Sequence, residues 1–277
     1  MSEFWKRTLS GALYVAVVVL SILFYEGFAW CILAALLACF SVREYNRLTH
    51  PRCFLDFYSE WAAFCLPFAA TYYAVSHLFI MVAIYCVVLL ICILIELWDK
   101  DGNPLANWGN LLVGQVMIAF PFALMNVLCH FNNYLLLAVF VLIWVNDTFA
   151  YLVGVSTAKM PGGNHKMFPR VSPKKSWEGL FGGMACTIGA AFILNRFGWF
   201  DSITREGYGL LIAGTFGFIV SVFGTLGDLV ESLMKRTVGV KDSGKFLPGH
   251  GGVLDRFDSI LLAAPMALFF VLFMMQC

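Results

Sequence analysis

Long apolar runs separated by short polar stretches dominate this chain. A helix needs about 20 apolar residues to cross a bilayer, and on that basis the pattern predicts about nine transmembrane helices. We expect them near residues 8–25, 27–42, 61–76, 78–97, 109–129, 133–153, 178–195, 207–227 and 256–275. The predicted fold class is therefore all-α, a polytopic helical bundle that is integral to the membrane.

The composition agrees with this interpretation and argues against a separate soluble domain. Of the 277 residues, 61% are hydrophobic and 13% are charged, and the mean hydropathy is +0.81. Such values are typical of membrane proteins. We therefore predict a single transmembrane domain over residues 1–277. Its first part, residues 1–130, is apolar with weakly patterned polar positions, whereas residues 131–277 carry most of the polar side chains.

The first part offers little chemistry. Arg43, Glu44 and Arg47 lie at the end of a predicted span, where charged side chains are expected to reach toward the lipid headgroups. We expect residues 1–130 to supply scaffold helices and lipid-facing surface, and they are also the candidate region for a homodimer contact. The nine cysteines contain no Cys-x-x-Cys pair, and most lie within predicted spans, which indicates free, buried thiols.

The distribution of basic residues predicts the orientation. In a nine-span arrangement, all but Arg196 and Arg205 of the 18 Lys and Arg residues lie on one side, together with the N-terminus. The positive-inside rule places that side in the cytoplasm. The loops at 154–177 and 228–255 are then cytoplasmic, and the C-terminus lies outside.

Charge is concentrated between Gly227 and Asp258, a segment flanked by two apolar runs. This segment contains five acids and five bases, which are Asp228, Glu231, Asp242, Asp255 and Asp258, with Lys235, Arg236, Lys241, Lys245 and Arg256. A solvated loop can carry such charge, but it does not require Pro248, His250 and a Gly251-Gly252 pair between two carboxylate clusters.

The spacing of these acids suggests a metal site. If the helix that enters from residue 207 continues, Asp228 and Glu231 share one face, and Asp255 and Asp258 repeat the same i, i+3 spacing. Two carboxylate pairs joined by a loop of lysines and glycines can hold a divalent ion beside bound phosphates. Hard oxygen ligands suit Mg²⁺, and Lys and Arg bind phosphoryl oxygens.

Two earlier segments also carry polar residues. Asp147 lies inside an apolar run, where an ionisable residue either forms hydrogen bonds within the bundle or lines a functional cavity. Ser172-Pro173 is expected to begin a helix, with Glu178 in its first turns, so that Lys174 and Lys175 lie beside an anion-binding helix terminus. The alternative for these lysines is an ordinary positive-inside flank.

Glycines recur between residues 207 and 227, at Gly214, Gly217, Gly224 and Gly227 among others. Glycines in a membrane helix allow close approach of a second helix. We therefore expect this helix to lie deep in the bundle and to carry Asp228 and Glu231 to its cytoplasmic end.

Three segments together resemble the phosphatidate cytidylyltransferases, also called CDP-diacylglycerol synthases. The long signature comprises Ser232, Lys235-Arg236, Lys241-Asp242, Pro248, His250-Gly251-Gly252, Asp255-Arg256 and Asp258. The other two are Asp147 with Ala150-Tyr151 and Gly154, and the run Ser172-Pro-Lys-Lys-Ser-Trp-Glu-Gly179. Residues 155–168 are longer than the family pattern, which leaves the roles of Lys159, His165 and Lys166 open.

The resemblance implies the reaction of CTP with phosphatidate to give CDP-diacylglycerol and pyrophosphate, catalysed by residues 131–277. It implies Mg²⁺ as cofactor, with a second monovalent or divalent cation left open, and metal ligands chosen from Asp228, Asp242 and Asp255, with Glu231 and Asp258 as further candidates. Because the substrate phosphate is itself the nucleophile, positioning and charge neutralisation would carry the catalysis.

The resemblance also assigns substrate contacts. Nucleotide and substrate binding falls to Lys174 and Lys175, with Asp147, Ser172, Glu178, Ser232 and the backbone of Gly251 and Gly252. Neutralisation of phosphatidate or pyrophosphate falls to Lys235, Arg236, Lys241 and Arg256, and His250 either donates to a phosphate or braces its loop.

The expected partners are CTP, phosphatidate and the bilayer, with no nucleic acid, and the expected location is the inner, cytoplasmic membrane. Two alternatives remain. One is a related CTP-dependent enzyme that acts on an isoprenoid lipid, such as a CDP-archaeol synthase or a polyprenol kinase relative. The other is an ion-coupled transporter that uses Asp147 and Asp228, although no internal repeat is visible.

Overall fold

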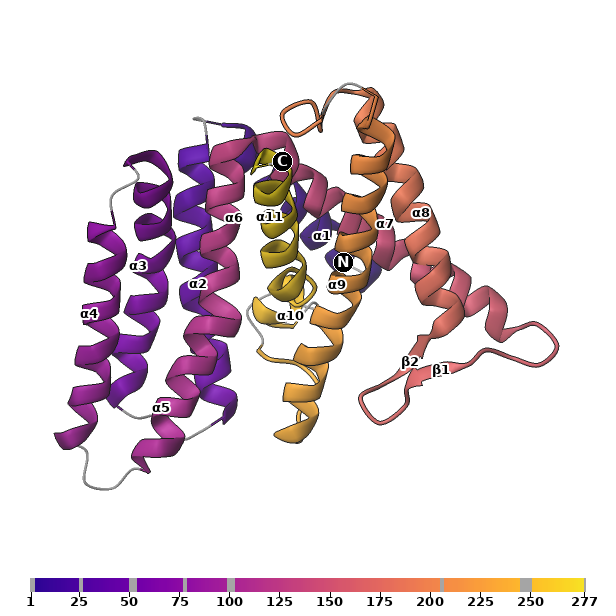
Figure 1. Ribbon diagram of the computed structural model, residues 1–277. Helices are drawn as coiled ribbons and strands as arrows, with labels where there is room; N and C mark the ends of the chain where they lie inside the picture. The colour runs from indigo at the N-terminus through magenta and orange to yellow at the C-terminus, as the bar shows by residue number, and fades with distance from the viewer. Residues whose placement is uncertain are drawn as a thin grey trace. The chain divides into compact units, whose positions relative to one another are not determined.

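A computed structural model shows a helical protein with one small β-hairpin (Figure 1). It describes residues 3–24, 27–49, 54–76, 79–98, 103–204, 207–244 and 251–276. The all-α fold class is confirmed. The chain divides into two compact units, one formed by Met1–Asn133 with Val238–Phe257 and the other by Tyr134–Thr237 with Asp258–Cys277.

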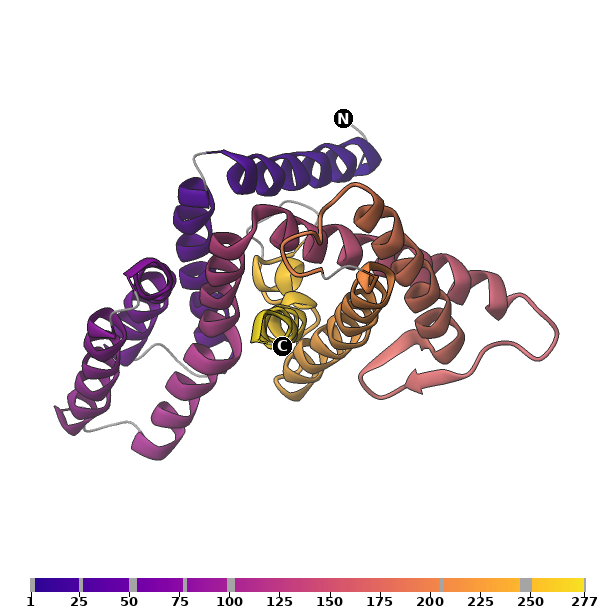
Figure 2. The same ribbon diagram turned by 45° about the horizontal axis from the view of Figure 1, so that its top comes forward.

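The first unit contains most of the helices. They are α1 (Glu3–Leu23), α2 (Phe28–Thr49), α3 (Phe54–Ser76), α4 (Ile80–Ile95) with the 3₁₀ turn η2 (Glu96–Trp98), α5 (Pro104–Val113), the π-helical segment η3 (Gly114–Ala119), α6 (Phe120–Phe131) and the short α10 (Leu254–Phe257). Helix α2 packs against α3 and α6, and α3 packs against α4, as Figures 1 and 2 both show. Trp30 and Phe122 are fully buried in this unit.

The second unit contains α7 (Asn133–Ala158), the hairpin strands β1 (Lys166–Phe168) and β2 (Ser172–Ser176), α8 (Trp177–Arg196), α9 (Gly209–Thr237) and α11 (Ile260–Gln276). Helix α9 is central, because it packs against both α8 and α11. This confirms the expectation that the glycine-rich helix lies deep in its bundle.

Each of the nine predicted spans coincides with a helix or a continuous helical run. Within the described residues, seven runs are long and apolar enough to cross a membrane. The other two expected spans correspond to α1, whose described apolar part is the short Gly11–Leu23, and to the less apolar α3. The protein is thus a multi-pass membrane protein.

Glycines bring the helices of the second unit together. A Cβ at Gly182 would lie 2.6 Å from a methyl group of Val153 on α7, and one at Gly183 would lie 2.9 Å from the carbonyl oxygen of Asn146. On α9, a Cβ at Gly217 would lie 3.0 Å from Ala191 of α8. Only a residue without a side chain permits these approaches, as expected for close helix packing in membranes.

Three local predictions were wrong. Ser172 does not begin a helix; it lies in β2, which pairs with β1, and α8 starts at Trp177 with Ser176 as its N-cap. Asp255 and Asp258 do not share a helical face, because α10 ends at Phe257 and α11 begins only at Ile260. The acids Asp228 and Glu231 are not at the end of α9 either, since the helix continues to Thr237.

For the described cysteines, the prediction of free thiols is confirmed, but the prediction that they are buried is wrong for several of them. Cys31, Cys39, Cys65, Cys86, Cys92, Cys129 and Cys186 are all free thiols. Of these, Cys31, Cys92 and Cys129 are buried, as small apolar side chains are, while Cys65 and Cys86 are exposed on the surface of their helices.

Gly227 gives a direct test of this packing. A Cβ at this position would lie 2.6 Å from the carbonyl oxygen of Asp258 and 2.9 Å from that of Ser259, and backbone atoms cannot move aside easily. We expect Gly227→Ala to lower the free energy of unfolding by about 1–3 kcal/mol, the usual cost of overpacking. Thermal unfolding of the detergent-solubilised protein measures this.

The matched control is Gly189→Ala on α8, where a Cβ would meet no atom within 4 Å. Because alanine favours helix over glycine, this change should leave stability unchanged or raise it by up to about 1 kcal/mol. Equal melting temperatures for the two variants would contradict the packing described for α9 and the start of α11.

Candidate active site

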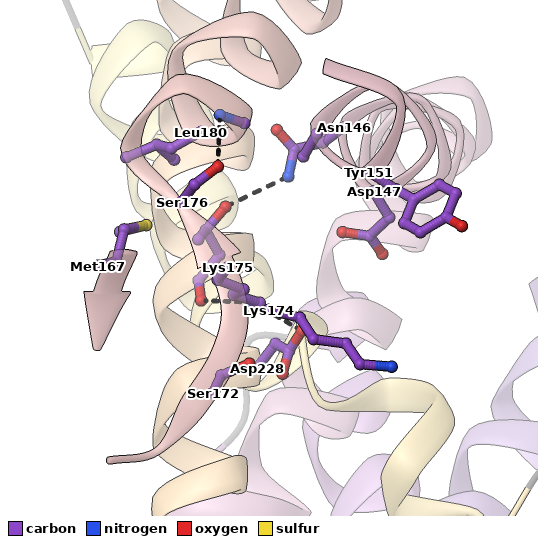
Figure 3. Close-up of a pocket in the computed structure, with 13 residues that line it drawn as sticks. Asn146, Asp147, Tyr151, Met167, Ser172, Lys174, Lys175, Ser176, Leu180 and Asp228 are labelled. Atoms are coloured by element: carbon purple, nitrogen blue, oxygen red, sulfur yellow. Dashed lines mark hydrogen bonds and ion pairs between the residues drawn. The ribbon is translucent and has the colours of Figure 1, made fainter. Parts of the chain in front are cut away.

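A cavity of about 360 Å³ lies in the second unit between α7, the β-hairpin, the start of α8 and α9 (Figure 3). Its polar lining includes residues from all three segments that the sequence analysis had selected in this unit: Asp147 on α7, Ser172, Lys174 and Lys175 on β2, and Asp228 on α9. The structure therefore brings together side chains that lie up to 81 positions apart in the sequence, as the numbers of Asp147 and Asp228 show.

A buried polar network fixes α7 against α9 next to this cavity. The Ser221 hydroxyl donates to Asn146 Oδ1 at 2.6 Å, and Asn146 Nδ2 donates to Thr225 Oγ1 at 3.3 Å. All three residues are buried. Because buried polar groups are costly unless they are hydrogen-bonded, these contacts set the rotation of α7 and so place the adjacent Asp147 at the cavity wall.

Asp228 is held from two sides. Lys175 Nζ lies 2.7 Å from Asp228 Oδ2, and the Ser232 hydroxyl donates to Asp228 Oδ1 at 3.2 Å. Lys175 Nζ also donates to the carbonyl oxygen of Thr225 at 3.5 Å. Lys174, the preceding residue of the strand, is exposed at the cavity. One lysine is thus tied to α9, while its neighbour is accessible to an anion from solvent.

The hairpin that carries these lysines is braced at its open end, where β1 begins and β2 runs into α8. The Ser176 hydroxyl caps α8 by accepting a hydrogen bond from the Gly179 N–H at 3.2 Å. The Glu178 carboxylate accepts the backbone N–H of His165 at 3.0 Å and lies 2.7 Å from its Nδ1. The Trp177 N–H donates back to the His165 carbonyl oxygen at 2.9 Å. Glu178 therefore anchors the turn before β1, and the longer 155–168 segment acquires a defined geometry.

Further acids lie along the second unit. Glu231 is fully buried and forms an ion pair with the largely buried Lys235, whose Nζ lies 2.6 Å from Glu231 Oε2. Asp258 interacts electrostatically with Asp228, Glu231 and Asp147. Two of these carboxylates, Asp228 and Glu231, form ion pairs with Lys175 and Lys235.

The remaining signature residues belong to the first unit. Asp255 accepts the N–H of Ser243 at 2.9 Å and the N–H of Gly252 at 2.7 Å through Oδ2. Gly251 has a φ of 84°, a left-handed conformation that favours glycine. Lys241, Asp242 and Arg256 are exposed to solvent. Asp255 is therefore an internal brace of this loop, whereas the sequence analysis assigned it only a ligand role.

A sequence model of the cytidylyltransferase family matches residues 5–274. The chain belongs to this family. Curated proteins named phosphatidate cytidylyltransferase are also similar to it: that of Staphylococcus epidermidis is 44% identical over 134 residues, and that of Staphylococcus aureus is 45% identical over the same length. The aligned part is 48% of this chain and 47% of each relative, so the chain spans about half the length of the curated relatives it matches.

The predicted site residues fall into two groups, one in each compact unit. The second unit holds Asp147, Ser172, Lys174, Lys175, Glu178, Asp228, Glu231, Ser232, Lys235, Arg236 and Asp258, and the first unit holds Lys241, Asp242, Gly251, Gly252, Asp255 and Arg256. His250, Lys245 and Pro248 lie outside the described residues.

Two residues were missed or misread from the sequence. Glu44 was expected at the lipid interface, but it is 8% exposed and accepts hydrogen bonds from the signature loop. Asn146 is a buried connector between helices that drew attention only as the neighbour of Asp147. The sequence signals each of these residues only as a polar position in or beside an apolar run. That signal does not show which residue it will contact.

Proposed function

We propose that this cytidylyltransferase transfers the cytidylyl group of CTP to phosphatidate, forming CDP-diacylglycerol and releasing pyrophosphate. The observation that carries the proposal is the cavity lined by Lys174 and Lys175 together with Asp147 and Asp228 in a membrane helix bundle. Family membership and the names of the staphylococcal relatives support it. A lipid phosphate and a nucleotide are both anions, so a site that joins them needs cations beside carboxylates.

The chain's own residues would act by positioning and charge. The phosphate of phosphatidate attacks the α-phosphorus of CTP, and the bond to the β-phosphate bridging oxygen breaks as pyrophosphate leaves. Lys174, exposed at the cavity, would bind the nucleotide phosphates. Lys175 is fixed by Asp228 and would present a cation of defined position. Holding the two phosphates in a fixed geometry lowers the entropic part of the reaction's activation barrier.

The donor chemistry in the second unit fits Mg²⁺. Asp228, Glu231 and Asp258 offer hard oxygen atoms, and Asp147 lies within electrostatic range of Asp258. Among the described residues no three such side chains are gathered as a preformed metal site. Asp228 and Glu231 are instead held by lysines. When bound, Mg²⁺ would neutralise phosphate charge, with Asp228, Glu231 and Asp258 as its protein ligands.

In the first unit, Asp242 and Asp255 remain proposed metal ligands, but they differ in exposure and in hydrogen bonding. Asp242 is exposed and lies where a cation from solvent reaches it. Asp255 already accepts hydrogen bonds from two backbone N–H groups. Its replacement would therefore disturb the loop, so that Asp255 is not the residue on which to test metal binding.

The substrate assay tests the proposed function directly. Purified protein in phospholipid–detergent micelles should convert labelled CTP and phosphatidate into CDP-diacylglycerol when Mg²⁺ is present. A parallel reaction with an isoprenoid lipid phosphate or alcohol separates the related CTP-dependent activities. Product only in the isoprenoid reaction, or no product in either, would refute the proposal.

The orientation is a further part of the proposal. We propose that the 154–177 and 228–255 segments face the cytoplasm together with the N-terminus, since all but two of the 18 Lys and Arg residues fall on that side of a nine-span arrangement. A cysteine placed at 162–165 of a cysteine-free variant should resist impermeant thiol reagents in intact cells. As the matched control, Asp201→Cys in the connection after α8 should react. The reverse labelling pattern would refute the orientation.

The lysine pair yields a kinetic prediction. Lys174→Ala should raise the KM for CTP by about 10- to 100-fold, since a hydrogen bond to a charged group contributes about 1.5–3 kcal/mol. The melting temperature should hardly change, because the side chain is exposed. Arg170→Ala is the control, because it removes a cation from the same hairpin but does not line the cavity. Equal CTP kinetics in the two variants would contradict nucleotide binding by Lys174. Its charge would then serve only the positive-inside orientation of the chain.

The acids yield a metal prediction. Asp228→Asn and Asp242→Asn keep side-chain size but remove the charge that attracts a hard cation, so turnover should fall by about 100- to 1,000-fold. Binding of Mn²⁺ as a spectroscopic substitute for Mg²⁺ should weaken in parallel. Asp201→Asn, an exposed acid in the turn after α8, is the control and should keep full activity. Normal turnover of both Asp228→Asn and Asp242→Asn at limiting Mg²⁺ would contradict the metal assignment.

A further inference from the structure

Glu44 of α2 is a buried carboxylate whose contacts within the first unit all lie in one loop. Its Oε2 accepts the Ser243 hydroxyl at 3.0 Å and the Leu254 N–H at 2.9 Å, and its Oε1 accepts the Val253 N–H at 3.0 Å. The donors come from the two ends of the segment 243–254. One side chain thus joins both ends of the loop to a helix about 200 residues earlier in the chain.

Two glycines show how closely the loop surrounds this carboxylate. A Cβ at Gly244 would lie 2.9 Å from the Glu44 carboxyl carbon, and a Cβ at Gly252 would lie 2.7 Å from the same atom. Neither position has room for a side chain while Glu44 keeps its place. The carboxylate therefore fills the space between the two ends of the loop.

The same loop ends are joined a second time by Asp255, which accepts the N–H groups of Ser243 and Gly252. Asp255 belongs to the loop itself, so its bonds fix only the internal shape of the segment. Glu44 belongs to α2, and its bonds fix the loop relative to a long helix of the same unit. The two carboxylates have different mechanical roles.

We propose that Glu44 is a positioning residue, which holds Ser243 and residues 253–254 so that the adjacent Asp242 and the Gly251-Gly252 backbone keep the orientation needed for phosphate and metal binding. This inference rests on the proposed function for the role of those neighbours. Burial of an ionised carboxylate is unfavourable unless donors satisfy it, and three donors do so here. All three bonds form together only when Ser243 and residues 253–254 lie in one arrangement, so Glu44 fixes the positions of these described residues.

Glutamine cannot replace this carboxylate. Its amide has one acceptor oxygen and one NH₂ group, so the NH₂ group must face the N–H of either Val253 or Leu254. Glu44→Gln should therefore break one of the two backbone hydrogen bonds at residues 253–254 and weaken the attachment to α2, while keeping side-chain volume. Some residues orient functional groups by hydrogen bonds without contacting the substrate. Substituting such a residue typically lowers activity by about 10- to 100-fold.

The matched control is Glu96→Gln. Glu96 is also a buried acid of the first unit, 3% exposed, and its carboxylate accepts a hydrogen bond from Asn107 Nδ2 of α5 instead of from the loop. The same substitution there removes a buried charge without touching residues 243–254. A loss caused by general destabilisation should appear in both variants.

The first measurement is amide hydrogen exchange of the purified full-length protein, which does not depend on activity. Glu44→Gln should speed exchange at Ser243, Val253 and Leu254, whereas Glu96→Gln should leave these amides unchanged. Ser243→Ala, which removes only the hydroxyl bond, should produce a smaller increase and serves as the test if Glu44→Gln does not fold. Unchanged exchange in Ser243→Ala and Glu44→Gln would overturn the inference.

The second measurement is steady-state kinetics with CTP varied at saturating phosphatidate. A purely structural defect lowers the apparent kcat through the folded fraction and leaves KM unchanged. We expect Glu44→Gln to lower kcat/KM by about 10- to 100-fold and to raise the KM for CTP, relative to Glu96→Gln. Equal KM values in the two variants would overturn the positioning role. If wild-type protein itself makes no CDP-diacylglycerol, the proposed function fails, and the exchange experiment still decides whether Glu44 holds the loop.

Discussion

The structure depends on supplying hydrogen-bond donors or cations to carboxylates that are buried inside an apolar helical protein. Burying a charge in such surroundings is costly unless hydrogen-bond donors or cations meet it. Here each buried acid has a dedicated partner set: backbone N–H groups and a hydroxyl for Glu44, Lys235 for Glu231, and Asn107 for Glu96. Glu44 attaches residues 243 and 253–254 to α2, and Glu96 joins η2 to α5, whereas Glu231 and Lys235 satisfy each other within α9. Of these acids, Glu231 is the one proposed as a metal ligand.

The absence of side chains at a few positions makes this arrangement possible. Gly182 and Gly183 let α8 approach α7, and Gly217 lets α9 approach α8, so that the Asn146 network closes between α7 and α9. Without a hydrophobic driving force between helices in lipid, such close packing and interhelical hydrogen bonds supply the attraction. The cavity that contains Asp147 and Asp228 is a consequence of this packing.

The β-hairpin has a different role: it fixes the positions of two lysine side chains, Lys174 and Lys175. Lysine side chains are long, and at a free loop their charges would have no fixed position. Pairing of β1 with β2, the Ser176 cap and the Glu178 contacts to His165 give the strand a defined path. Lys175 then reaches Asp228, while Lys174 stays exposed at the cavity.

The sequence by itself determined the membrane-spanning helices, the family and most site candidates, because apolar run length and the spacing of charged motifs are local properties. It did not decide that Ser172 lies in a strand, since pairing with β1 outweighs a local helix-start signal. It also placed Glu44 at the membrane interface, because a charge at the end of an apolar run looks the same whether it meets lipid headgroups or a loop. Only the tertiary structure supplied the donors of the 243–254 segment, which are about 200 residues away in the chain. A carboxylate's role depends on its partners, and partners distant in sequence are set by folding.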